Sequence, residues 1–162
     1  MKLARSYEYE ARLPEVSLML SMPGLDYLRG IIRGDYPSAP ISATLNFYPV
    51  EADVGRAVFE GVPERFAYNP LGTVHGGWAA TILDSALGCA VHTTLPAGKY
   101  YTTVDLSISL VRAISEKTKR VRCEANIVHA GSRVATAEAK LLDDRGHLCA
   151  HGTTTCLVMS PR

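Results

Sequence analysis

The sequence lacks a charge excess, a long apolar run and an apolar start, and each absence excludes a class of protein. Its 162 residues carry 17 Lys and Arg against 16 Asp and Glu, whereas a dedicated nucleic-acid binder usually shows a basic excess or stripe. No uninterrupted apolar run approaches the roughly 20 residues of a membrane helix, so we expect no membrane partner. Because Glu8 and Glu10 stand where a secretory signal would be apolar, we also expect no such signal.

Cysteine is scarce, and the familiar catalytic motifs are missing. The four cysteines have no C-x-x-C spacing and stand inside apolar patterns (Cys89, Cys123, Cys149 and Cys156). We therefore expect reduced core thiols in a cytoplasmic protein rather than a disulfide framework. The chain has no G-x-S-x-G, no G-x-x-x-x-G-K-[ST] and no G-x-G-x-x-G motif. His147 and His151 would lie ~13 Å apart along a strand, too far for one metal ion, so we expect no metal site.

The residues that are present suit one hydrophobic core preceded by an extension. Apolar residues make up 47% of the chain, and this length fits a single domain. We expect a helical extension over residues 1–40 and the main domain over residues 41–160. In the extension, Pro14 and Pro23 can each occupy a first helical turn. Residues 25–32 carry apolar side chains at helical spacing, and Gly34 can end this helix in a left-handed C-cap.

In the main domain, alternating patterns predict strands around one apolar helix. The alternating stretches are residues 41–47, 55–61, 103–110, 120–127, 135–141 and 148–158. Short turns between the last three predict an antiparallel meander. Residues 76–91 lack proline and are apolar almost all round, which predicts a helix buried on most sides. The sum is an α+β fold in which an antiparallel sheet wraps around a long central helix.

Asp84 is the only carboxylate in this apolar helix. Burying a lone carboxylate is costly unless it is paired or faces a polar cavity, and residues 66–98 contain no Lys or Arg. The alternative is a structural Asp that bonds a neighbouring backbone group or reaches solvent, although the middle of a helix is a poor place for a cap. Asp84 is therefore a candidate catalytic carboxylate.

The second candidate is the run His75-Gly76-Gly77, where the helix begins. Free backbone N–H groups and the positive end of the helix dipole point at whatever lies there. Two glycines let a ligand approach the backbone closely, so the site can hold an oxyanion or polarise a carbonyl. The alternative is a simple tight turn from loop to helix.

The spacing of the two candidates predicts an oligomer. His75 and Asp84 are nine residues apart, which is about 2.5 turns and ~13.5 Å along a helix. They would lie on opposite faces, so one helix cannot bring both to the same atom. A two-fold pair with antiparallel helices would place each helix start beside the partner's acid, twice. We therefore expect a homodimer, or a dimer of dimers, with shared sites.

At this point the residues resemble a known family. The run Asn69-Pro70-Leu71-Gly72-Thr73-Val74-His75-Gly76-Gly77, followed by Asp84 and by Thr103-Val104-Asp105, is similar to the hotdog-fold acyl-CoA thioesterases. The phenylacetate-degradation (PaaI-like) branch is the most similar one, over about residues 41–158. The resemblance implies the hotdog fold, hydrolysis of acyl-CoA to a free acid and coenzyme A, and no cofactor beyond the coenzyme A of the substrate.

The same resemblance implies catalytic roles for four residues. Asp84 would attack the thioester or activate water, and the Gly76 N–H would polarise the thioester carbonyl. His75 would fix that loop. Asn69, from the subunit opposite Asp84, would position the water or the carbonyl.

Four further residues are predicted to bind substrate. Gly77 lies at the helix start, and Thr103 matches the Ser or Thr that the family has near the acid. Simple alternation puts Thr103 on the polar face of its strand, away from Val104, unless a bulge re-aims it. Arg112 and Arg133 are candidates for the phosphates of coenzyme A, with solvated structural arginines as the alternative.

Two other functions stay open. A hotdog hydratase or dehydratase commonly pairs an acid with a histidine five residues later on the same helix, and this chain has Cys89 there. A non-catalytic acyl-CoA or lipid-binding module would use Asp84 only structurally. The acyl group would lie along Trp78, Ile82 and Leu83, or along the partner's apolar strand face.

Overall fold

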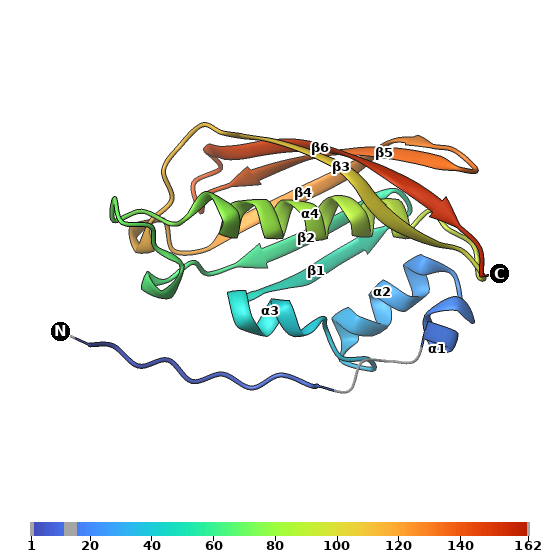
Figure 1. Ribbon diagram of the computed structural model, residues 1–162, viewed down its shortest axis with the longest axis horizontal. Helices are drawn as coiled ribbons and strands as arrows, with labels where there is room; N and C mark the ends of the chain where they lie inside the picture. The colour runs from blue at the N-terminus through green and yellow to red at the C-terminus, as the bar shows by residue number, and fades with distance from the viewer. Residues whose placement is uncertain (1, 12–15, 162) are drawn as a thin grey trace.

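One long helix, α4 (Gly76–His92), lies against a six-stranded antiparallel sheet in the computed structural model, which describes residues 2–11 and 16–161 (Figure 1). Three short helices precede the sheet: α1 (Val16–Leu20), α2 (Gly24–Arg33) and α3 (Pro40–Leu45). Helices α2 and α3 lie along β1, on the side of α4 that the sheet leaves open (Figure 1). The layout confirms the predicted α+β fold with a central helix and an N-terminal helical part.

The strands follow the order β1-β2-β4-β5-β6-β3 across the sheet, and each neighbouring pair is antiparallel. Their bounds are β1 (Phe47–Asp53), β2 (Arg56–Gly61), β3 (Tyr100–Leu110), β4 (Val121–Ala130), β5 (Val134–Leu142) and β6 (Leu148–Met159). The adjacency of β4, β5 and β6 confirms the predicted meander. Strand β3 pairs only with β6 among the described residues, so its other edge is free for a further strand.

Helix α4 is buried as its composition predicts. Ile82, Leu83, Ala86 and Leu87 are 0% exposed, and the helix contacts every strand of the sheet. Burying each Leu or Ile side chain stabilises the fold by about 1.5–3 kcal/mol, so this helix is the centre of the core. A nearly all-apolar helix of this length has no polar face for solvent, so a carboxylate on it, Asp84, is unexpected.

The N-terminal helices follow the predicted signals in part. Pro23 directly precedes α2, and Gly34 ends it with a φ of 84°, which confirms the left-handed C-cap. Pro14 lies outside the described residues. Two 3-10 turns complete the secondary structure: η1 (Arg65–Ala67) and η2 (Glu116–Thr118).

The strand predicted for residues 41–47 is wrong. Pro40 occupies the first turn of α3, where its fixed φ suits a helix and its missing N–H would be unpaired anyway. Asn46 then takes a left-handed φ of 58° and ends the helix, so β1 begins only at Phe47. Ser42, which the alternation placed towards solvent, is only 4% exposed. Proline chemistry and tertiary burial outweigh the short alternating pattern here.

His92, the last residue of α4, makes the stability of the fold depend on pH. It is 6% exposed and lies between the rings of Tyr27 and Tyr101, with centroid distances of 6.0 and 5.7 Å. Burial lowers the pKa of His92 from 6.5 to about 4, so the folded protein holds it neutral.

We expect the free energy of unfolding to fall by about 3 kcal/mol between pH 6.5 and pH 4 through His92 alone. Between these pH values His92 is protonated in the unfolded chain but neutral in the folded chain. The stability that the neutral, buried His92 allows is therefore fully present above pH 6.5 and is lost as the pH falls towards 4. Urea unfolding of the wild type and of His92→Phe at both pH values measures it. Parallel pH profiles for the two proteins would contradict the prediction.

Candidate active site

The start of α4 leaves one backbone donor free. His75 is the N-cap residue, and its Nδ1 atom accepts a hydrogen bond from the Gly77 N–H at 2.8 Å. The Trp78 N–H donates to the His75 carbonyl oxygen at 2.9 Å. Within residues 2–11 and 16–161, the Gly76 N–H has no acceptor, as is usual for a donor in a first helical turn. His75 therefore fixes the turn, the Gly77 N–H is engaged, and Gly76 is the open donor.

A pocket of about 260 Å³ lies beside this donor and brings together three of the predicted residues, Asn69, Gly76 and Arg112. A Cβ atom on Gly76 would stand 2.6 Å from Leu110 Cδ1, the flexible end of that side chain, so α4 and β3 approach each other closely at this glycine. Arg112, an exposed residue, also lines this pocket and is the one predicted arginine that does so. The pocket therefore combines a free N–H with a positive side chain.

Asn69 shapes the loop at this pocket. Its Oδ1 atom accepts a hydrogen bond from the Leu71 N–H at 2.9 Å, and its Nδ2 atom donates to Thr73 Oγ1 at 3.0 Å. These bonds close the turn that leads into His75, in the manner of an Asx turn. Asn69 therefore lines the pocket beside Gly76, with its amide used within its own loop.

Asp84 lies half-buried on α4, and its Oδ1 atom accepts a hydrogen bond from Thr103 Oγ1 at 3.1 Å. The carboxylate forms no ion pair with any residue of the described ranges. Thr103 supplies one donor and leaves the remaining lone pairs of the carboxylate open. A partly buried, unpaired carboxylate of this kind can act as a general base or a nucleophile.

A β-bulge brings Thr103 to Asp84. The β3–β6 register shifts between Thr103, opposite Cys156, and Asp105, opposite Thr155, so Val104 is the extra residue. Before the bulge Thr103 faces α4. The predicted core position of Val104 is wrong, because its side chain points outward and is 60% exposed.

A second pocket of about 240 Å³ lies beside Asp84 and Thr103. The sequence offered Trp78, Ile82 and Leu83 as one path for an acyl group, but these side chains are 3%, 0% and 0% exposed. They face the sheet and do not line this pocket, so that path is wrong. The other walls come from α2, α3 and the strands, which no local sequence signal connects to Asp84.

One chain does not unite the predicted residues. Asn69, Gly76 and Arg112 share one pocket, whereas Asp84 and Thr103 share another. Eight residues separate Gly76 from Asp84, which is ~12 Å along α4. Each group holds one half of the chemistry that acyl transfer requires, a carbonyl-polarising donor in the first and a carboxylate in the second.

The two arginines also lie far apart in one chain. The Arg112 N–H donates to the Cys149 carbonyl oxygen near the start of β6, while the Arg133 carbonyl oxygen accepts from the Val158 N–H near its end. Nine residues of strand separate these points, which is ~30 Å. Only Arg112 is thus near Gly76, and Arg133 lies towards the end of the sheet where β3 carries Thr103.

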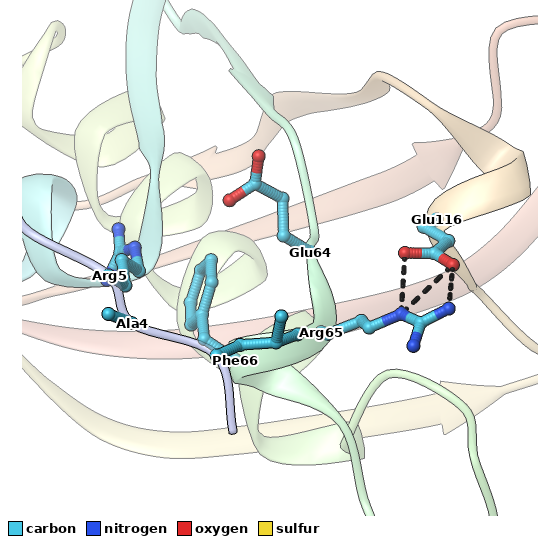
Figure 2. Close-up of a pocket in the computed structure, with 7 residues that line it drawn as sticks. Ala4, Arg5, Glu64, Arg65, Phe66 and Glu116 are labelled. Carbon is cyan, nitrogen blue, oxygen red and sulfur yellow. Dashed lines mark hydrogen bonds and ion pairs between the residues drawn. The ribbon is translucent and has the colours of Figure 1, made fainter. Parts of the chain in front are cut away.

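A further pocket, of about 680 Å³, lies under the N-terminal segment and contains no predicted site residue. Arg5 donates to the carbonyl oxygen of Thr44 at 2.7 Å and lies over the Phe66 ring, 3.8 Å from its centroid. Figure 2 shows Arg5 and Phe66 beside the ion pair of Arg65 and Glu116, in which Arg65 Nη2 lies 2.8 Å from Glu116 Oε1. The exposed Glu64 side chain lines this pocket, but none of its lining residues belongs to the start of α4, so it is not the candidate active site.

Residues 2–11 and 16–161 contain no group of three or more His, Cys, Asp or Glu side chains placed to hold a metal ion. No helix among them is long and apolar enough to cross a membrane.

A family comparison matches the region that contains both halves of the site. The model of the Thioesterase superfamily matches residues 71–150, from the loop before α4 into β6. Over these residues the chain is similar to the thioesterase superfamily. The fold is the hotdog fold of PaaI-like thioesterases, and both results support thioester hydrolysis as the general class of reaction.

Solved structures of PaaI-like thioesterases resemble this chain over most of its length. A phenylacetic acid degradation-related protein of Ralstonia eutropha is 28% identical, with a TM-score of 0.74 over 81% of this chain and 98% of that one. A variant of the phenylacetic acid degradation protein PaaI of Thermus thermophilus is 25% identical, with a TM-score of 0.66 over 74% of this chain and 98% of that one.

A curated relative supports the same class of reaction over a shorter region. A protein of Halobacterium salinarum named as an esterase is 37% identical over 73 residues, which is 44% of this chain and 46% of that protein. The chain therefore matches about half the length of this relative.

Proposed function

We propose that this protein hydrolyses acyl-CoA thioesters to a free acid and coenzyme A, at sites shared between two copies of the chain. The single observation that carries the proposal is the free Gly76 N–H and the unpaired Asp84 carboxylate on one helix. Hydrolysis of a thioester needs a donor for the carbonyl oxygen and a base or nucleophile for the carbonyl carbon. The two groups supply these functions.

In the proposed reaction the thioester oxygen accepts a hydrogen bond from the Gly76 N–H. Asp84 takes a proton from a water molecule whose oxygen bonds to the carbonyl carbon, or attacks that carbon itself and is released by water. The C–S bond breaks, and the sulfur of coenzyme A receives the proton. In each route one water is consumed and one acid and one thiol are formed. His75 holds the donor turn, and Asn69 shapes the loop beside it.

The free edge of β3 supports the shared site. Thr103, which bonds Asp84, lies near one end of this strand, and Leu110, which approaches Gly76, lies at the other. Two β3 edges related by a two-fold axis would run antiparallel, so each Thr103 end would meet the partner's Leu110 end. Val104 and Leu110 are 60% and 58% exposed along this strand. We propose a homodimer, alone or paired into a dimer of dimers.

The same pairing supports a place for coenzyme A. Arg112 stands at the Gly76 pocket, and Arg133 lies towards the Asp84 end of the sheet. Across a two-fold pair, these arginines of different copies would approach one site and meet the phosphates. No cofactor is proposed beyond the coenzyme A of the substrate. Four free cysteines support a cytoplasmic location.

A thiol-release assay over an acyl-CoA panel tests the proposed function. We expect free coenzyme A to appear in proportion to acid formed, with at least one acyl-CoA turned over many times per chain. Tight acyl-CoA binding without thiol release would instead identify a binding module. Crotonyl-CoA hydrated without thiol release would identify a hydratase. Cys89 argues against the hydratase reaction, because it stands where a hydratase commonly has a histidine. Burial raises the pKa of the Cys89 thiol to about 12, so the thiol stays protonated.

A further inference from the structure

The pocket beside Asp84 is lined by the N-terminal helices α2 and α3 as well as by α4 and the sheet. Leu28 and Ile31 of α2 line it, as does Ser42 of α3. Phe59 and Tyr101 complete the walls from β2 and β3. Leu28, Ser42 and Phe59 are 2%, 4% and 4% exposed, so this end of the pocket is built into the core. The N-terminal helices are therefore part of a cavity that contains the candidate carboxylate.

The walls of this pocket suit an uncharged group. Aliphatic and aromatic side chains alternate with hydroxyls, and Asp84 is the only charged side chain among the lining residues. The Cys89 thiol in the wall stays neutral because burial raises its pKa. A carboxylate brought into the pocket would meet the Asp84 charge and no cation, which disfavours acyl groups with a second acid.

The volume of the pocket limits the size of its occupant. At about 240 Å³ it is smaller than the roughly 300–1,000 Å³ of pockets for drug-sized ligands. One water molecule takes about 30 Å³ in the liquid, and a methylene or ring CH group takes a similar volume, so the pocket holds roughly eight such groups. A single ring or a short chain fits within this space, whereas a long unbranched fatty chain would extend beyond it.

We propose that helices α2 and α3 form the acyl-binding pocket and restrict the enzyme to compact, neutral acyl groups of up to about eight carbons. The proposal rests on the proposed function, since it assigns the acyl end of the same substrate. It gives residues 24–45 a role in specificity. Ile31 is the half-buried pocket side chain of α2 and therefore sets the depth available to the acyl chain.

Ile31→Ala tests this role, with Ile32→Ala as the matched control. Ile32 is the next residue of the same helix, is also half-buried and packs on the core, but does not line the pocket. Thiol release is measured with butanoyl-, hexanoyl-, phenylacetyl-, dodecanoyl- and succinyl-CoA. The wild type is expected to prefer the hexanoyl and phenylacetyl thioesters to the dodecanoyl and succinyl thioesters by about tenfold or more in kcat/KM.

Ile31→Ala is expected to raise the dodecanoyl-to-hexanoyl ratio of kcat/KM about tenfold, and Ile32→Ala is expected to leave it unchanged. Melting temperatures of both variants report any general loss of packing. Equal ratios in Ile31→Ala and Ile32→Ala, or a wild type that prefers dodecanoyl- or succinyl-CoA, would overturn the pocket assignment while thioesterase activity stands. Absence of thiol release from every acyl-CoA would overturn the proposed function, and the pocket assignment with it.

Discussion

Asp84→Asn is expected to lower kcat for thioester hydrolysis by about 10²–10⁴-fold. The amide keeps nearly the shape of the carboxylate, and its Oδ1 atom can still accept the hydrogen bond from Thr103. What the variant loses is the negative charge that takes a proton from water or attacks the carbonyl carbon. Steady-state thiol release with the best acyl-CoA of the panel measures the effect.

The same variant is expected to keep or slightly raise its melting temperature. The Asp84 charge is half-buried and has no ion-pair partner in the described part of the chain, so its removal costs the fold little. Asp144→Asn is the control, because it makes the same chemical change at an exposed residue of the turn between β5 and β6. Wild-type turnover in Asp84→Asn would remove the carboxylate from the mechanism, and a large loss of melting temperature would identify it as structural.

Much of the fold follows from periodicity, because the elements that carry it are long and have one environment. Helix α4 is apolar on nearly all sides and contains no proline. This pattern is typical of a helix that is buried on most sides. Strands β4 to β6 are nine or more residues long and alternate over most of that length, with core alanines such as Ala125 and Ala137 on one face. In such segments local preference and tertiary burial agree.

The two errors in the fold arise where a single residue overrides the pattern. Pro40 starts a helix in a stretch that alternates like a strand, and Ser42 is buried there despite its hydroxyl. The bulge at Val104 reverses the faces of β3, so residues before and after it obey opposite alternations. Neither event has a periodic signature, since each depends on which neighbour packs against the chain.

The candidate site likewise has residues that the sequence predicts and residues that it does not. Asp84 and the turn His75-Gly76-Gly77 stand out because an isolated acid and two glycines are anomalous in an apolar helix. The walls contributed by Leu28, Ile31 and other distant residues are ordinary apolar side chains, and only the packing of α2 and α3 brings them to Asp84. The shared site is a prediction from helix geometry that rests on a second copy of the chain.

Gly76→Pro is expected to lower kcat by about 10²–10³-fold, because it removes the proposed oxyanion donor and little else. Gly76 is the first residue of α4, where proline is favoured, and its N–H holds no other group of the described chain. His75 already has the φ of -62° and ψ of 137° that a residue before proline adopts.

The control for this variant is Gly76→Ala. It adds the Cβ atom that approaches the flexible end of Leu110, as proline also does, but keeps the N–H. Thiol release and melting temperature are measured for both. A loss of activity confined to Gly76→Pro supports the donor role, whereas equal losses in both variants would assign the effect to crowding by the added carbon.

Mixing the two inactive proteins tests whether each site takes its acid and its donor from different chains. A hybrid dimer of Asp84→Asn and Gly76→Pro has one site with both defects and one site with neither. After free exchange of subunits, half of the dimers are hybrids, so about a quarter of the wild-type activity should return. Sites built within one chain would recover nothing on mixing. An Asp84→Asn/Gly76→Pro double variant, exchanged with the wild type, should instead inactivate both sites of every hybrid and lower the activity per wild-type chain to about half.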